Sequence, residues 1–139
     1  MITLNVAEVI SLHDKLLVAT GGSPGLRDIG LLESAILSCY QSFDDADLYP
    51  TVIEKAARMA YTIAKNHPFV DGNKRVAVTS MLVMLRLNNI STLFTQDELI
   101  VLGLGVADGS IGYDEIVNWI HEHLVDGSTP YHLPADNSL

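Results

Sequence analysis

Three short patterns in this 139-residue chain mark the beginning of an α-helix. In each of them an Asn or Thr is followed three residues later by a Glu: Asn5 with Glu8, Thr51 with Glu54, and Thr95 with Glu98. In such a capping box the two side chains accept each other's backbone N–H groups, which a helix end otherwise leaves without partners. Apolar residues follow at helical spacing, and no convincing pair of strands is found. The sequence therefore predicts an all-α fold.

We expect about six helices, over residues 6–19, 30–40, 51–66, 73–88, from 95 onward, and 113–124. Residues 42–50 hold three Asp and no clear period, which indicates a loop or a short extended flap. The helix over 51–66 has an apolar stripe with spacings of three and four: Ile53, Ala56, Ala60, Ile63 and Ala64. Its charged residues are expected on the opposite, solvent-facing side: Glu54, Lys55, Arg58 and Lys65.

Composition limits the class of protein. The apolar fraction of 48% is enough for a real core, and we expect one domain over residues 1–125 with a loose tail over 126–139. The net charge of −9 argues against binding to nucleic acid or to an anionic membrane surface. The longest uncharged apolar run, Val76–Leu85, is about half of a membrane span. The single cysteine, Cys39, and the lack of a signal-peptide pattern indicate a cytoplasmic protein.

The segment that carries chemistry joins two of the expected helices: His67-Pro68-Phe69-Val70-Asp71-Gly72-Asn73-Lys74-Arg75. Cations are disfavoured at a helix N-terminus, yet Lys74 and Arg75 lie in the first turn. Two cations beside free backbone N–H groups suit a bound polyphosphate, which Gly72 would let approach closely. Asp71 is placed to hold a divalent metal that bridges phosphate oxygens.

His67 extends the apolar stripe of the preceding helix, so we expect it at the core-facing edge of the loop. An imidazole titrates near neutral pH and can take a proton from an attacking hydroxyl. Together these groups indicate phosphoryl or nucleotidyl transfer. Each residue alone also has a purely structural interpretation: Asp71 or Asn73 as the N-cap of the next helix, His67 as a helix C-terminal residue, and Lys74 and Arg75 as solvated cations.

The segment resembles the signature of the Fic/Doc family, H-P-F-x-(D/E)-G-N-G-R-x-x-R. The match holds at seven positions: His67, Pro68, Phe69, Asp71, Gly72, Asn73 and Arg75. Lys74 replaces the second glycine and Val78 the second arginine, and both departures are typical of the death-on-curing (Doc) branch. The run from Gly21 to Asp28 is similar to that branch as well. The likeness extends over roughly residues 5–125.

This resemblance implies a compact Fic fold with a short flap. It also implies ATP as the substrate and Mg²⁺ as the metal cofactor. It implies His67 as the general base, Asp71 as the Mg²⁺ ligand, and Gly72, Asn73, Lys74 and Arg75 as phosphate-binding residues. Residues 42–50 would correspond to the flap that aligns the target peptide. Fic enzymes transfer AMP, whereas Doc proteins transfer the terminal phosphate, to a threonine of elongation factor Tu. Doc is a toxin, neutralised by the antitoxin Phd.

Two rival functions stay open at this stage: a Fic-type AMP transferase, and a catalytically silent binding module. Many Fic enzymes inhibit themselves through a helix of the form (S/T)-x-x-x-E-(G/N). Residues 1–139 contain no such run; Ser110 with Glu115 is one residue too long. The sequence therefore predicts inhibition by a separate partner. Arg27, in the loop before the second helix, could reach a phosphate or pair with an acid, and it has no assigned role.

Overall fold

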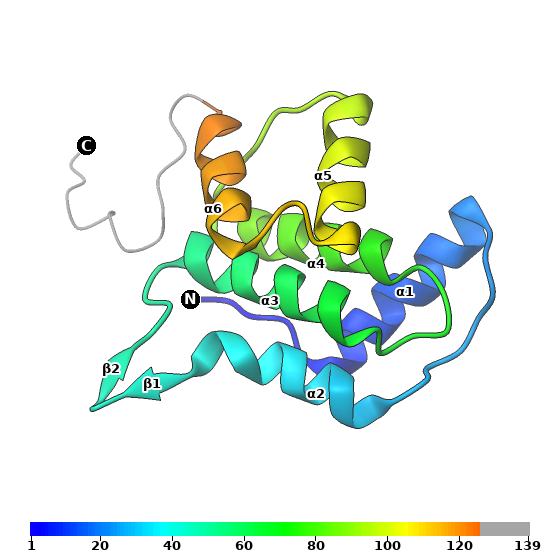
Figure 1. Cartoon of the computed structure of the whole chain (residues 1–139), viewed down its shortest axis with the longest axis horizontal. Coiled ribbons are helices and arrows are strands. Elements are labelled where there is room, and N and C mark those ends of the chain that lie inside the picture. The colour runs from blue at the N-terminus through cyan, green and yellow to red at the C-terminus, as the bar shows by residue number, and fades with distance from the viewer. Residues whose placement is uncertain (126–139) are drawn as a thin grey trace.

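The computed structural model describes residues 1–125; the expected tail over 126–139 lies outside the described residues. Six α-helices follow one another along the chain, with a short 3₁₀ helix and a small hairpin after the second (Figure 1). Their bounds are α1 (Val6–Thr20), α2 (Ile29–Leu37), η1 (Ser38–Tyr40), β1 (Ser42–Phe43), β2 (Ala46–Asp47), α3 (Val52–Asn66), α4 (Asn73–Leu87), α5 (Gln96–Asp108) and α6 (Tyr113–Glu122). This confirms the all-α prediction. In the described part of the chain, no helix is long and apolar enough to cross a bilayer.

All three predicted capping boxes are present, at the starts of α1, α3 and α5. In α1 the Asn5 side chain accepts the Glu8 N–H at 2.8 Å, and Glu8 accepts the Asn5 N–H at 2.9 Å. The predicted helix ends are correct to within one or two residues except in α2, where the last turn tightens into η1. Local hydrogen bonding thus determines most of the boundaries.

The long helices α3 and α4 form the centre of the molecule (Figure 1). On their other sides α3 packs against α2 and α6, and α4 against α1 and α5. The predicted apolar stripe of α3 is buried along its whole length. The methionines Met81 and Met84 of α4 are completely buried, as expected of a helix in the middle of a bundle. The chain between these two helices is the segment of interest, so both of its ends are held by helices of the buried core.

One residue of α3 is not where the helical pattern puts it. Lys55 was expected on the solvent-facing side, but it is only 4% exposed. Its ammonium group donates to the Cys39 carbonyl at 3.2 Å and contacts the Asp47 carboxylate at 3.4 Å. The hairpin folds back over this face of α3, and its carboxylate gives the buried cation a partner. The prediction was wrong because the covering segment comes from outside the helix.

Candidate active site

His67 ends α3 in the left-handed backbone conformation, with φ 51° and ψ 57°. Its side chain is exposed, so the expectation of a core-facing position was wrong. Arg27 holds this helix end: its Nε donates to the His67 carbonyl at 2.7 Å and its Nη2 to the Asn66 carbonyl at 2.9 Å. Both carbonyls belong to the last turn of α3, where the C=O groups have no N–H partner within the helix. Arg27 therefore caps this helix end, and its printed partners among the described residues are carbonyl groups rather than an acid.

The loop after His67 is fixed to the segment that precedes α2. The Pro68 carbonyl accepts the N–H groups of Arg27 and Asp28, at 2.7 and 3.0 Å, and Val70 N–H donates to the Gly25 carbonyl at 3.0 Å. Phe69, at 2% exposure, anchors this loop in the core, as the sequence suggested. Burial of such a side chain contributes roughly 1.5–3 kcal/mol. The loop is therefore a rigid platform.

Asn73 has a structural role in the loop that the sequence analysis did not assign to it. Its side-chain oxygen accepts the Phe69 N–H and its amide nitrogen donates to the Phe69 carbonyl, both at 2.9 Å. The side chain is buried, and both of its polar atoms are occupied. Asn73 thus holds the loop, and its amide nitrogen keeps a second N–H that these bonds do not use. The N-cap of α4 is Gly72, so neither Asp71 nor Asn73 is the cap.

Asp71 lies at the surface of the site with its carboxylate already oriented. Its Oδ2 accepts Ser23 N–H at 3.0 Å, and its Oδ1 accepts Gly72 N–H at 2.8 Å. These two backbone bonds hold the pKa of Asp71 below its ordinary value, so the group is anionic at neutral pH. Each carboxylate oxygen has a second lone pair, which leaves room for a cation. Asp71 therefore fits the expected Mg²⁺ ligand.

No cluster of three or more His, Cys, Asp or Glu side chains that could hold a metal occurs in residues 1–125. A site built from one carboxylate and substrate phosphates needs no such cluster, because Mg²⁺ is commonly held in that way.

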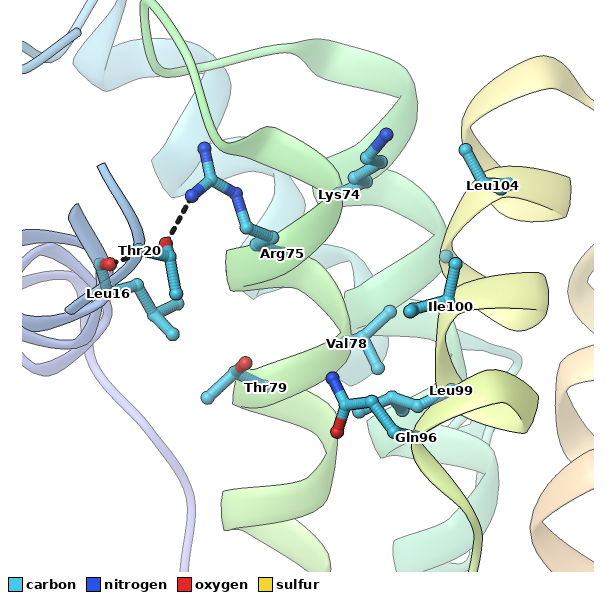
Figure 2. A pocket seen from close by; sticks show the side chains of 11 residues that line it. Leu16, Thr20, Lys74, Arg75, Val78, Thr79, Gln96, Leu99, Ile100 and Leu104 are labelled. Atoms are coloured by element: carbon cyan, nitrogen blue, oxygen red, sulfur yellow. Dashed lines mark hydrogen bonds between the residues drawn. The ribbon is translucent and has the colours of Figure 1, made fainter. Parts of the chain in front are cut away.

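Lys74 and Arg75 lie in the first turn of α4, as predicted. No side chain caps this helix, so its first N–H groups remain open for an anion. Arg75 reaches back to the end of α1, where it donates to the Gly21 carbonyl at 2.9 Å and to the Thr20 hydroxyl (Figure 2). A Cβ on Gly22 would come within 2.8 Å of the Asp71 carboxylate and 3.0 Å of Arg75. Only glycine allows the end of α1 to approach so closely.

Two adjoining cavities meet at these cations. The first, here called the motif cavity, has a volume of about 680 Å³ and contains His67, Asp71, Gly72 and the end of α1. The second, the apolar cavity, has a volume of about 350 Å³ and lies between α1, α4 and α5. It is lined mainly by Leu16, Val78, Leu99, Ile100 and Leu104 (Figure 2). Thr20, Lys74 and Arg75 line both, so the cations sit at the boundary between a polar and an apolar compartment.

The sequence model of the Fic/DOC family matches residues 3–85, which include α1 to α3, α4 as far as Leu85, and the whole motif cavity except Ala107. The chain belongs to the Fic/Doc family. It is 34% identical over 111 residues to a protein named Protein kinase doc, of Escherichia phage P1; the match covers 80% of this chain and 86% of that protein. It is 37% identical over 73 residues to Toxin Doc of Mycolicibacterium smegmatis, covering 52% of this chain and 56% of that protein.

The position of the hairpin differs from the one the family resemblance implied. Residues 42–50 do contain a short extended element, since β1 and β2 pair in an antiparallel manner. However, this element lies at the start of α3, whereas His67 is at its end (Figure 1). A helix of 15 residues is about 22 Å long. The segment beside the Fic/Doc motif is instead 21–28, which pairs with the loop through Leu26 and Phe69.

Sequence reasoning missed His13 altogether. This α1 residue is 1% exposed, and its Nε2 lies 2.7 Å from the Asp71 carbonyl oxygen. The signal was present in the sequence: His13 follows Val9 by four residues and therefore lies in the buried stripe of α1. A histidine on an apolar face needs a hydrogen-bond partner, and here that partner is the motif itself.

Proposed function

We propose that this protein is a Doc-type toxin, a protein kinase that transfers the γ-phosphate of ATP to a protein hydroxyl. The observation that carries the proposal is the arrangement of the two cavities around Lys74 and Val78. A nucleoside needs an apolar compartment, and a triphosphate needs cations and free N–H groups. The apolar cavity lies on the Val78 side and His67 on the other. A nucleotide that bridges the two would therefore present its terminal phosphate to His67.

In this proposal each residue has a defined role. His67 is exposed at the motif cavity, and it takes the proton of the acceptor hydroxyl as the hydroxyl oxygen bonds to the γ-phosphorus. The bond from that phosphorus to the bridging oxygen of ADP breaks in the same step. Lys74, Arg75 and the backbone N–H groups at the start of α4, which Gly72 leaves open to close approach, stabilise the phosphate charge. Mg²⁺ held by Asp71 would neutralise part of the same charge when bound.

The acceptor proposed from the family resemblance is a threonine of elongation factor Tu, whose modification would arrest translation. The names of the two relatives support the class of activity, toxin and protein kinase. The choice of this acceptor rests on the resemblance alone. It is tested by incubating the purified chain with elongation factor Tu and with a variant in which the threonine is replaced by valine.

The decisive experiment supplies ATP labelled at either the γ- or the α-phosphate. We expect label on the target only from γ-labelled ATP. Label from α-labelled ATP would identify a Fic-type AMP transferase. No transfer of either label, with intact nucleotide binding, would favour the catalytically silent module.

We also propose that inhibition comes from an antitoxin of the Phd type, through an apolar helix laid beside the apolar cavity. Ile100 and Leu104 of α5 are each 49% exposed at this cavity, and the neighbouring Val101 is 63% exposed. A partner helix with its apolar face here would cover the route by which a nucleoside enters. We expect the isolated chain to be active and the complex inactive. A fully self-inhibited isolated chain would contradict this.

A further inference from the structure

We propose that His13 is a positioning residue that fixes the direction of the Asp71–Gly72 peptide group, and so keeps the Gly72 N–H on the Asp71 carboxylate that the site offers to Mg²⁺. This inference rests on the function proposed above and adds a residue outside the motif to it. The evidence is the burial of His13, its bond to the Asp71 carbonyl, and the backbone conformation of Gly72.

His13 is held rigidly in place. Its imidazole stacks on the Phe69 ring with the two centroids 3.8 Å apart and the planes 11° from parallel. Phe69 is in turn fixed by both side-chain atoms of Asn73. A carbonyl oxygen can only accept a hydrogen bond, so the 2.7 Å contact to Asp71 requires a proton on Nε2. The Nδ1 atom lies 3.9 Å from the Asp14 carboxylate, too far for a hydrogen bond.

The bond matters because the next residue is a glycine. A peptide group is planar, and in the trans form its C=O and N–H point in opposite directions. When His13 holds the Asp71 carbonyl, it also directs the Gly72 N–H to the opposite side of this peptide group, where the N–H donates to the Asp71 carboxylate. Gly72 has φ 78° and ψ 17°, the left-handed conformation that glycine adopts without strain.

Glycine adopts negative φ about as readily as positive φ, so the backbone at Gly72 does not by itself hold the preceding peptide group in one orientation. Without a lock, the Asp71–Gly72 peptide could therefore turn over. The carbonyl oxygen would then point toward the motif cavity and repel phosphate oxygens. The other bonds of Asp71 involve its side chain, so among the described contacts His13 holds the carbonyl side of this peptide.

Two variants separate positioning from packing. His13→Phe keeps a flat ring against Phe69 but has no donor, whereas His13→Gln keeps an N–H at similar reach and loses the ring. The exposed His121 of α6 provides a matched control, His121→Phe. The readouts are the ¹⁵N–¹H signal of Gly72 in the ligand-free protein, the Kd for a non-hydrolysable ATP analogue with Mg²⁺, and kcat.

We expect His13→Phe to shift or broaden the Gly72 signal, to weaken analogue binding and to lower kcat on the order of 10²-fold, the effect of a small misplacement in an active site. His13→Gln should restore most of all three, and the control should change none. Equal impairment of both variants, in step with their melting temperatures, would show that His13 only packs. An unchanged Gly72 signal and unchanged analogue affinity in His13→Phe would also overturn the proposal.

A measurement on the wild-type protein needs no variant to fold. The imidazole of His13 must carry its proton on Nε2, and that proton must be protected from exchange. A proton on Nδ1 would contradict the inference. If the Gly72 signal responds as expected but no γ-label is transferred to any target, the kinase proposal fails and the positioning role of His13 stands.

Discussion

His67 combines an exposed imidazole with a backbone conformation that few non-glycine residues adopt. The left-handed region costs most side chains roughly 1–2 kcal/mol, and Asn, Asp and His occupy it more often than other residues. At this position it turns the chain sharply from α3 into the loop, so that a residue at a helix end faces the motif cavity. The replacement chosen to test its role must therefore suit the backbone as well as remove the base.

We predict that His67→Asn retains the fold and lowers the transfer rate by 10²–10⁴-fold, the usual cost of losing a general base. Asparagine tolerates the left-handed conformation but cannot accept the hydroxyl proton. His67→Ala should lose the same activity and, in addition, about 1 kcal/mol of stability. Single-turnover rates and thermal unfolding measure the two effects. Turnover of His67→Asn near that of the wild type would remove His67 from the mechanism.

A second prediction concerns the carboxylate of Asp71. In Asp71→Asn one carboxylate oxygen becomes an NH₂ group, which can no longer accept a backbone N–H from Ser23 or Gly72. The Asp71→Asn variant also loses the negative charge that attracts Mg²⁺. We expect the variant to fold and to need a higher Mg²⁺ concentration for nucleotide binding, as titration calorimetry at several Mg²⁺ concentrations would measure. A variant with the Mg²⁺ dependence of the wild type would show that Asp71 is not the ligand.

At the scale of elements, α1 and α4 meet where one ends and the other begins. The Thr20–Gly21 end of α1 accepts from Arg75, while His13, two turns earlier, holds the Asp71 carbonyl. The N-terminal end of α4 is therefore assembled by a helix that is more than 50 residues away in sequence. Separately, α5 and α6 are joined by the pair of His123 and Glu98, whose Nε2 and Oε2 atoms are 3.0 Å apart.

This α5–α6 contact predicts a dependence of stability on pH. Burial lowers the pKa of His123, but its bond to the Trp119 carbonyl and the nearby Glu98 outweigh this, so that the pKa is raised above its ordinary value. The capping contact with Thr95 and the bond to His123 lower the pKa of Glu98. The histidine thus stabilises the fold fully below about pH 6.5, and this contribution is lost as the pH rises through its folded-state pKa.

We therefore expect His123→Gln to lower the melting temperature at pH 6 more than at pH 8.5. The exposed His121, on the same helix, gives the control His121→Gln, which should show no such difference. An effect of His123→Gln that is equal at both pH values would mean that the charge on the imidazole contributes nothing.

The sequence predicted what depends on neighbours along the chain. The capping boxes, the stripe of α3 and the first turn of α4 all follow from residues within four positions of each other. Lys55 was misjudged, and Arg27 was left without a role, because their partners come from other segments: the hairpin and the end of α3. His13 was missed for the same reason, since its hydrogen-bond partner, the Asp71 carbonyl, is 58 residues away.

At the scale of the whole molecule, the proposed nucleotide site is a boundary between two cavities, and α1, α4 and α5 contribute residues to both. The family match ends at residue 85, so α5, which provides one wall of the apolar cavity, lies beyond it. On the α4 side the wall is Val78, at 6% exposure, opposite Gly103 of α5. The residue at position 78 therefore decides whether this compartment can accept an apolar group.

This gives the last prediction, which concerns the direction in which ATP lies. An arginine at position 78 would fill the apolar cavity with a cation, and a glycine at position 74 would open space for a phosphate in its place. We expect Val78→Arg to weaken binding of the Mg²⁺–ATP analogue, while Leu87→Arg, an equal charge at an exposed site on the same helix, leaves it unchanged. Lys74→Gly with Val78→Arg should raise the ratio of α- to γ-label on the target. If the double variant folds and binds ATP but its labelling ratio equals that of the wild type, these two positions do not set the orientation.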